Sequence, residues 1–185
     1  HPGVRRQRQM CIRDSIYGYG LMNEPHDLTP ETSWFDMAQA SINAIREVDT
    51  NTLIMVGGND WSSAERWIEQ SDTLKYLKDP ANNLAFEAHV YFDKDASGTY
   101  KYSYEEEECY PEKGIDRVKP FVEWIKQNKF HGFIGEYGIP DNDPRWNETL
   151  DLFLGYLQEN GINGTYWAAG PWWDSLSLIH ISEPT

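Results

Sequence analysis

Two glutamates stand where the sequence predicts that β-strands end. Glu24 follows the run "GLMN" and Glu136 follows "GFIG". Carboxyl groups about 5 Å apart can hydrolyse a glycosidic bond with retention of configuration, one as the nucleophile and the other as acid and base. Either glutamate alone would be interpreted as an ordinary strand-end residue that binds a helix N-terminus or an arginine. Their neighbours make the pair a candidate site.

A histidine and a tyrosine favour that interpretation. His89 and Tyr91 belong to the run "LAFEAHVYF", residues 84–92. Side chains alternate along a strand, so if His89 points inward, Glu87 and Tyr91 do as well, and the apolar residues between them face the helices. A lone histidine is more often a satisfied core residue, but this polar face indicates a site at the ends of the strands.

The elements that would position these residues recur along the chain. β-type runs occupy residues 16–25, 52–59, 84–92, 132–140 and 164–173, and segments with helical periodicity occupy residues 35–48, 114–128 and 146–161. Residues 93–113 are expected to form a long loop, whose run of four glutamates is typical of a solvated surface.

Prolines and a glycine set local expectations for these elements. Pro25 should push the backbone of Glu24 away from the helical region and toward an extended conformation. Thr29 followed by Pro30 is an N-cap and first-turn pair, which predicts the start of the first helix. Pro120 indicates either a kink in the second helix or the position where that helix begins. Gly161 should end the third helix.

Strands that alternate with helices predict parallel β/α units, either as a doubly wound open sheet or as a (β/α)8 barrel. No glycine-rich phosphate loop is present, because "VGGN" has the wrong spacing. Polar residues end nearly every predicted strand. In a barrel such strand ends converge on one axis, whereas in an open sheet they spread along an edge. The sequence therefore favours an α/β fold of the (β/α)8 TIM barrel class.

The amino-acid composition limits the kinds of partner that this chain could bind. The chain has 185 residues and a net charge of −14, which disfavours nucleic acid and anionic membranes and is tolerated by a neutral substrate. Aromatic residues reach 14%, which fits either a large aromatic core or flat platforms for sugar rings. No apolar run approaches the about 20 residues that a membrane span needs. Cys11 and Cys109 support no inference of a disulfide.

Four motifs, "GLMNEPHD", "FEAHVYFD", "FIGEYGIP" and "YWAAGPWW", resemble glycoside hydrolase family five, and in particular its fungal-type endo-β-1,4-glucanases. The resemblance runs from about Ile16 to Asp174, with the motifs in the order of the family. It implies a (β/α)8 barrel and a retaining mechanism on cellulose or related β-glucans. It also implies that Glu24 is the acid/base and Glu136 the nucleophile, and that no metal or other cofactor is required.

The resemblance also implies substrate-binding roles. Asn23 would bind the 2-hydroxyl of the sugar being cleaved, and Tyr91 would hydrogen-bond the nucleophile. His89 would line the cleavage subsite, Trp167 would stack under its sugar, and Trp61, after "GGND", resembles a platform on the glycone side. His26, Asp27, His89 and Asp93 have no spacing typical of metal ligands.

The chain is shorter than a complete catalytic domain of the family. A (β/α)8 domain normally needs about 250 residues, and the five strands predicted here correspond to strands four to eight of the family. We expect residues 16–174 to be the C-terminal part of a catalytic domain. Residues 1–15 and 175–185 are expected to be atypical, non-native tails, since they resemble translated adapter sequence. Alone, such a chain should be aggregation-prone and nearly inactive, because unpaired strand edges leave the barrel open.

Several alternatives stay open at this stage. The same chemistry fits mannan, xyloglucan or mixed-linkage glucan. A non-catalytic sugar-binding relative could use the tryptophans alone, although it need not keep both glutamates. A structural α/β domain could pair the two carboxylates with arginines. For the enzyme we expect a polysaccharide substrate, secretion because that polymer cannot enter a cell, and a monomeric parent protein.

Overall fold

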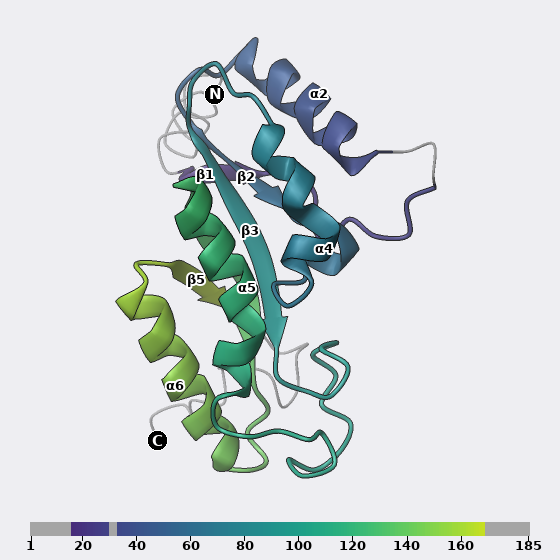
Figure 1. The fold of residues 1–185 in the computed structure, drawn as a ribbon, viewed down its shortest axis with the longest axis vertical. Coiled ribbons are helices and arrows are strands. Elements are labelled where there is room, and N and C mark those ends of the chain that lie inside the picture. The colour runs from purple at the N-terminus through teal and green to yellow at the C-terminus, as the bar shows by residue number, and fades with distance from the viewer. Residues whose placement is uncertain (1–15, 30–32, 169–185) are drawn as a thin grey trace, which may run out of the picture.

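The computed structural model describes residues 16–29 and 33–168. Its centre is one parallel sheet, in which each strand pairs with the next along the chain (Figure 1). The strands are β1 (Gly18–Gly20), β2 (Leu53–Gly57), β3 (Leu84–Tyr91), β4 (His131–Gly138) and β5 (Asn163–Tyr166). All five predicted strands are therefore present. The two predicted tails, residues 1–15 and 175–185, lie outside the described residues.

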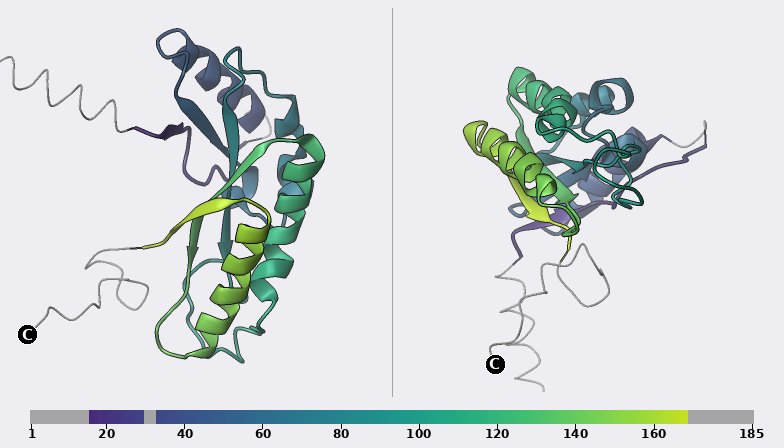
Figure 2. Two further views of the ribbon diagram at one scale, coloured as in Figure 1. Left: turned by 90° about the vertical axis from the view of Figure 1, so that its left-hand side faces the viewer. Right: turned by 90° about the horizontal axis from the view of Figure 1, so that it is seen from below.

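Helices connect the strands and cover one side of the sheet (Figure 2). They are α2 (Trp34–Arg46), α3 (Asn59–Ser62), α4 (Trp67–Ser71), the 3-10 helix η1 (Asp72–Tyr76), α5 (Lys113–Asn128) and α6 (Arg145–Glu159). A doubly wound sheet reverses its strand order at a switch point, whereas here the order follows the sequence throughout. This is the arrangement of part of a (β/α)8 barrel, and it confirms the predicted fold class.

One expected helix boundary needs correction, and the alternative left open at Pro120 is decided. Helix α2 does not start at the Thr29–Pro30 pair, because its N-cap is Ser33, which is extended and accepts a hydrogen bond from the amide of Asp36 at 3.3 Å. Pro120 lies inside α5 and does not mark its start. The end of α6 is as predicted, since Gly161 follows it with a positive φ of 66°.

Aromatic side chains form much of the core between the sheet and the helices. Trp67 of α4, Phe86 of β3 and Trp124 of α5 are almost completely buried. The rings of Trp67 and Trp124 meet edge to face with centroids 5.4 Å apart, and those of Phe86 and Trp124 do so at 4.9 Å. This geometry is the one that aromatic pairs prefer. A part of the high aromatic content therefore stabilises the fold and is not available to a ligand.

The segment after β3 has no helix or strand up to Lys113, as predicted for a long loop. Tyr100, in this loop, is buried and joins the carboxyl ends of two strands. Its hydroxyl accepts a hydrogen bond from the amide of Phe92 at 2.9 Å and donates one to the carbonyl of Gly138. The loop therefore fixes the spacing of β3 and β4 at the end where the candidate residues lie.

We expect Tyr100→Phe to loosen this end of the sheet. The change removes one hydroxyl and leaves a buried amide and a buried carbonyl without a partner, which costs about 1–3 kcal/mol. Urea unfolding should show this loss, and the amide of Phe92 should exchange with solvent faster. Tyr102→Phe is the matched control, because Tyr102 is 60% exposed in the same loop. Equal stabilities of the two variants would contradict the assigned role of the Tyr100 hydroxyl.

Candidate active site

Glu24 reaches the site through a sharp turn after β1. The amide of Leu21 still pairs with the carbonyl of Met55 at 3.1 Å, and the chain then leaves the sheet. Glu24 has a φ of 46°, so the predicted extended conformation is wrong. Proline disfavours the right-handed helical region for the residue before it but does not exclude the left-handed one. The turn is held because Pro25 is buried and its carbonyl accepts from the amide of Trp61 at 3.3 Å.

Glu136 reaches the site through a β-bulge. Ala88 of β3 lies opposite Ile134, but the next residue, His89, lies opposite Glu136, so Gly135 is an extra residue in β4. Ile134 and Tyr137 are both buried, three positions apart, whereas a regular strand would place residues two apart on one face. The bulge therefore turns Glu136 away from the helices and toward the inner face of the sheet.

The residue that the bulge inserts is held by the neighbouring strand. The carbonyl of Gly135 accepts a hydrogen bond from the hydroxyl of Thr165 in β5. The sequence "GFIG" gave no indication of this irregularity, because the bulge is visible only once β4 is paired with β3 and β5. Its effect is nevertheless decisive for the candidate chemistry, since it sets the direction of one of the two carboxylates.

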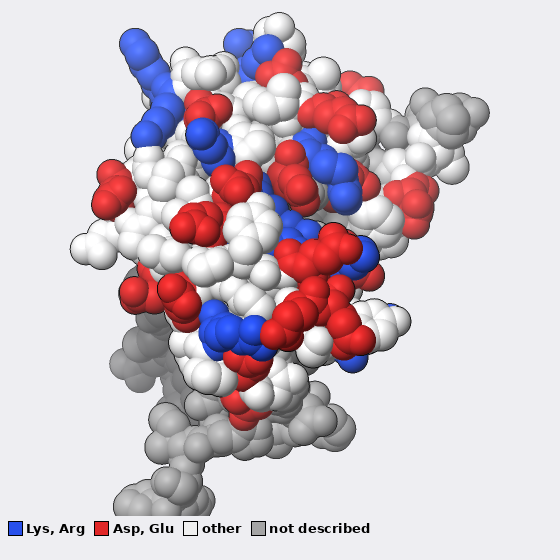
Figure 3. Space-filling view, turned by 60° about the horizontal axis from the view of Figure 1, so that its bottom comes forward, with Lys and Arg blue, Asp and Glu red and all other residues white. Residues whose placement is uncertain are grey.

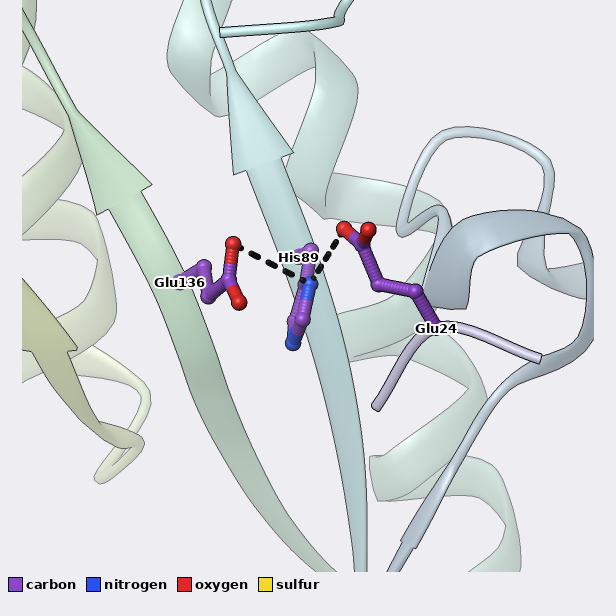
Figure 4. Close-up of side chains that lie close together, drawn as sticks. All are labelled: Glu24, His89 and Glu136. Atoms are coloured by element: carbon purple, nitrogen blue, oxygen red, sulfur yellow. Dashed lines mark hydrogen bonds and ion pairs between the residues drawn. The ribbon is translucent and has the colours of Figure 1, made fainter. Parts of the chain in front are cut away.

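The imidazole of His89 lies between the two carboxylates (Figure 4). Its Nδ1 is 2.7 Å from Oε1 of Glu24 and 3.6 Å from Oε2 of Glu136. One oxygen of each carboxylate and this nitrogen all lie within 4.8 Å of one another. The separation fits the short spacing of retaining glycosidases and is smaller than the roughly 6.5–9.5 Å of inverting ones.

The predicted polar face of β3 is confirmed. Phe86, Ala88 and Val90 are buried in the hydrophobic core. On the other face, His89 contacts Glu24, and the hydroxyl of Tyr91 donates a hydrogen bond to Oε2 of Glu136 at 2.8 Å. Strand periodicity was sufficient to identify this face because β3 is regular up to the bulge opposite His89.

The groups in the cluster shift one another's pKa values. Burial raises the pKa of Glu136, while the positive charge of His89 and the hydrogen bond from Tyr91 oppose that rise. For His89, burial lowers the pKa, but hydrogen bonds to Glu24 and Glu87 and the charge of Glu136 outweigh it and raise the pKa to about 9. Burial next to Glu136 also raises the pKa of Tyr91, so that this hydroxyl remains a donor.

Glu24, His89 and Glu136 form the one group among residues 16–29 and 33–168 whose ligand atoms are close enough together to hold a metal ion. Metal ligation requires an unprotonated imidazole nitrogen. With a pKa of about 9, the ring of His89 is protonated at neutral pH and donates to the carboxylates instead. In the structure these three residues interact with one another directly, through the contacts of His89 with the two carboxylates.

The other predicted site residues line cavities around this cluster. A cavity of about 370 Å³ brings together Asn23, Glu24, Tyr91, Glu136 and Trp167. A second cavity, of about 410 Å³, is lined by Glu24, His89, Tyr91 and Trp61 among others. Trp61 is 42% exposed and stacks on the ring of His26, with centroids 4.5 Å apart. All seven predicted residues thus lie in one region of the molecule.

Arg117 was not identified from the sequence, although it borders the second cavity. This buried arginine of α5 donates hydrogen bonds to the carbonyls of Tyr91 and Lys94, at the carboxyl end of β3. The sequence did contain a signal for its burial, because Arg117 directly precedes Val118 on the apolar side of the predicted helix. Its guanidinium holds the backbone next to Tyr91 in place.

Comparisons with known proteins agree with this geometry. The family described as cellulase (glycosyl hydrolase family 5) matches residues 11–172. The probable endo-β-1,4-glucanase B of Aspergillus kawachii is 38% identical over 167 residues, which are 88% of this chain and 47% of the relative. The endo-β-1,4-glucanase B of Emericella nidulans is 37% identical over 168 residues, 88% of this chain and 48% of the relative.

A solved structure is similar as well. The endoglucanase Cel5A of Pseudomonas stutzeri, in complex with cellobiose, superposes with a TM-score of 0.79 at 41% identity, over 92% of this chain and 52% of that one. The chain spans about half the length of these relatives. With its motifs, strand order and family match in agreement, the chain belongs to glycosyl hydrolase family 5, the cellulase family.

Proposed function

We propose that this chain supplies both catalytic glutamates of a retaining endo-β-1,4-glucanase. The observation that carries the proposal is the approach of one oxygen of Glu24, one oxygen of Glu136 and Nδ1 of His89 to within 4.8 Å of one another. The substrate follows from the relatives, which are named endo-β-1,4-glucanases, and from a related structure in complex with cellobiose. Because such a polymer cannot enter a cell, the enzyme would act outside it.

In the first step, Glu136 attacks the anomeric carbon while Glu24 donates its proton to the departing glycosidic oxygen. The bond between sugar and leaving group breaks, and the sugar is held as an ester of Glu136. The hydrogen bond from Tyr91 favours the charged form of Glu136 before the attack. This hydrogen bond supports the role of nucleophile that the family resemblance implies for Glu136.

In the second step, Glu24 removes a proton from water, and the hydroxide oxygen attacks the anomeric carbon. The ester bond breaks and Glu136 leaves as a carboxylate, which completes the retention of configuration. Once Glu136 is esterified, its negative charge no longer acts on Glu24, so Glu24 can serve as base after having served as acid. His89 donates to Glu24 throughout and keeps its carboxyl group in place.

The exposed Trp61 and the partly buried Trp167 would bind sugars on opposite sides of the cleaved bond. Trp167 shares its cavity with both glutamates and Asn23, which fits the subsite of the sugar that becomes attached. The cavity of Trp61 contains Glu24 but not Glu136. Since Glu24 protonates the leaving group, this placement favours the leaving-group side for Trp61, in contrast to the glycone side expected from the resemblance.

The surface fits an uncharged substrate. Acidic side chains gather over the face shown in Figure 3, with lysines and arginines between them, and the net charge of the chain is −14. A neutral glucan is not repelled by such a field, whereas nucleic acid is. Among the helices of the described residues, none combines the length and the apolar character that crossing a bilayer requires.

Substitution of the two glutamates tests the mechanism. The test protein is the completed barrel, which we define as this chain joined to an amino-terminal half-barrel, for which the Pseudomonas stutzeri endoglucanase is a source. Glu136→Gln should lower kcat on cellulose oligomers by about 1,000-fold or more, because the amide is not a nucleophile. Glu24→Gln should lower it by about 100-fold to 10,000-fold, and much less on an aryl cellobioside whose leaving group needs no proton.

The matched control is Glu159→Gln, an exposed change of equal charge at the end of α6. It should leave kcat and KM unchanged. If Glu136→Gln kept its activity, the retaining mechanism would be excluded for this chain. If the completed barrel hydrolysed mannan or xyloglucan in preference to cellulose oligomers, the mechanism would stand and the proposed substrate would be wrong.

The placement of the tryptophans has its own test. Trp61→Ala should raise KM for cellopentaose about tenfold, which corresponds to about 1.4 kcal/mol of lost binding. It should not affect an aryl cellobioside, which places no sugar on the leaving-group side. Trp167→Ala should impair both substrates. An equal effect of Trp61→Ala on the two substrates would contradict this placement and indicate that Trp61 binds a sugar on the glycone side.

A further inference from the structure

A third carboxylate belongs to the cluster and takes no part in the mechanism above. Glu87 lies on β3, on the same face as His89 and Tyr91. Its Oε1 is 3.3 Å from Nε2 of His89, and its side chain is 20% exposed compared with 4% for the imidazole. A partly buried acid next to two other carboxylates adds repulsion, which its contact with the imidazole offsets.

The two ring nitrogens of His89 face two different carboxylates. Nδ1 points to Glu24 at 2.7 Å and Nε2 to Glu87 at 3.3 Å. A neutral imidazole carries one N–H and can donate to one of them only, whereas the protonated ring donates to both. The geometry on the two sides of the ring therefore suits an imidazolium, in agreement with the raised pKa of His89.

The backbone provides a space for Glu87. A Cβ atom on Gly135 would lie 2.0 Å from Oε1 of Glu87 and 2.7 Å from its carboxyl carbon. The carboxyl group of Glu87 thus occupies the volume that any side chain at the bulge residue would fill. The bulge that turns Glu136 toward the site also creates the place of Glu87, so the two features depend on the same glycine.

We propose that Glu87 is a positioning residue that keeps His89 doubly protonated and fixes its ring with the Nδ1–H toward Glu24. A ring with a bare Nδ1 would instead accept the acidic proton of Glu24 and divert it from the leaving group. Glu87 thereby directs the catalytic proton without touching the substrate. The effect on catalysis rests on the proposed glucanase function, whereas the effect on the protonation of His89 does not.

Other charged groups near His89 do not replace this effect. Glu24, from the turn after β1, and Glu136, from β4, also raise the pKa of His89, so a Glu87 variant should lose only the part of the rise that Glu87 causes. Arg66 and Arg117 border the same cavity. Arg66 is paired with Asp60, and Nε of Arg117 lies 3.4 Å from Glu65. Their charges are therefore largely compensated, and they are not hydrogen-bonded to His89 in the structure.

The test is Glu87→Gln in the completed barrel, read first by NMR titration of the His89 ring. This isosteric change removes a negative charge and should lower the pKa of His89 from about 9 toward its ordinary 6.5, by one unit or more. Above the lowered pKa the ring loses a proton, so the alkaline limb of the kcat profile should move to lower pH by a similar amount. At pH 8 a shift of one unit should lower kcat about twofold and a shift of two units about tenfold, while KM changes less than twofold.

Two further variants separate positioning from structure. Gly135→Ala should displace the carboxyl group of Glu87 and lower the pKa of His89 without any change to Glu87 itself. Glu87→Asp keeps the charge and should restore a part of both the pKa and kcat. Glu159→Gln, the charge-matched control, should alter neither. An unchanged pKa of His89 in Glu87→Gln would overturn the proposal. Because this readout is independent of catalysis, it holds even if the completed barrel lacks glucanase activity.

Discussion

Carboxylates that face one another across a small gap repel, and this repulsion is the constraint on which the site depends. Glu24, Glu87 and Glu136 surround a single imidazole, that of His89. Without a positive charge between them, nothing within the cluster would offset the repulsion of these groups at short range. The protonated ring of His89 lets the carboxylates remain close together, and the Tyr91 hydroxyl adds a donor on the side of Glu136.

This constraint explains why regular secondary structure alone does not build the site. A regular parallel sheet places strand-end side chains about 4.8 Å apart between neighbouring strands, alternately on its two faces. Glu24 needs a left-handed turn, and Glu136 needs an extra residue in its strand. Departures of this kind concentrate at functional sites and are held by their surroundings. Here the surroundings are the Thr165 hydroxyl, the buried Pro25 and the Tyr100 bridge.

The same distinction separates what could be predicted from the sequence from what could not. Strand periodicity in residues 84–92 predicted which side chains of β3 face the site, and the alternation of strands and helices predicted the fold. The backbone of Glu24 was predicted incorrectly, because the preference before proline is local while the turn is held by contacts with residues near Trp61. The bulge, the Tyr100 bridge and the Arg117 contacts depend on pairing between distant segments. Aromatic content likewise could not show that Trp124 is buried while Trp61 is exposed.

The extra residue in β4 carries a consequence for how such a site can arise or be lost. If Gly135 were paired as an ordinary residue of β4, regular alternation would place Glu136 on the same face as Ile134, among the helices. A barrel that keeps both glutamates could therefore lose the proposed chemistry through a change in the pairing of one strand, without a substitution at either acid.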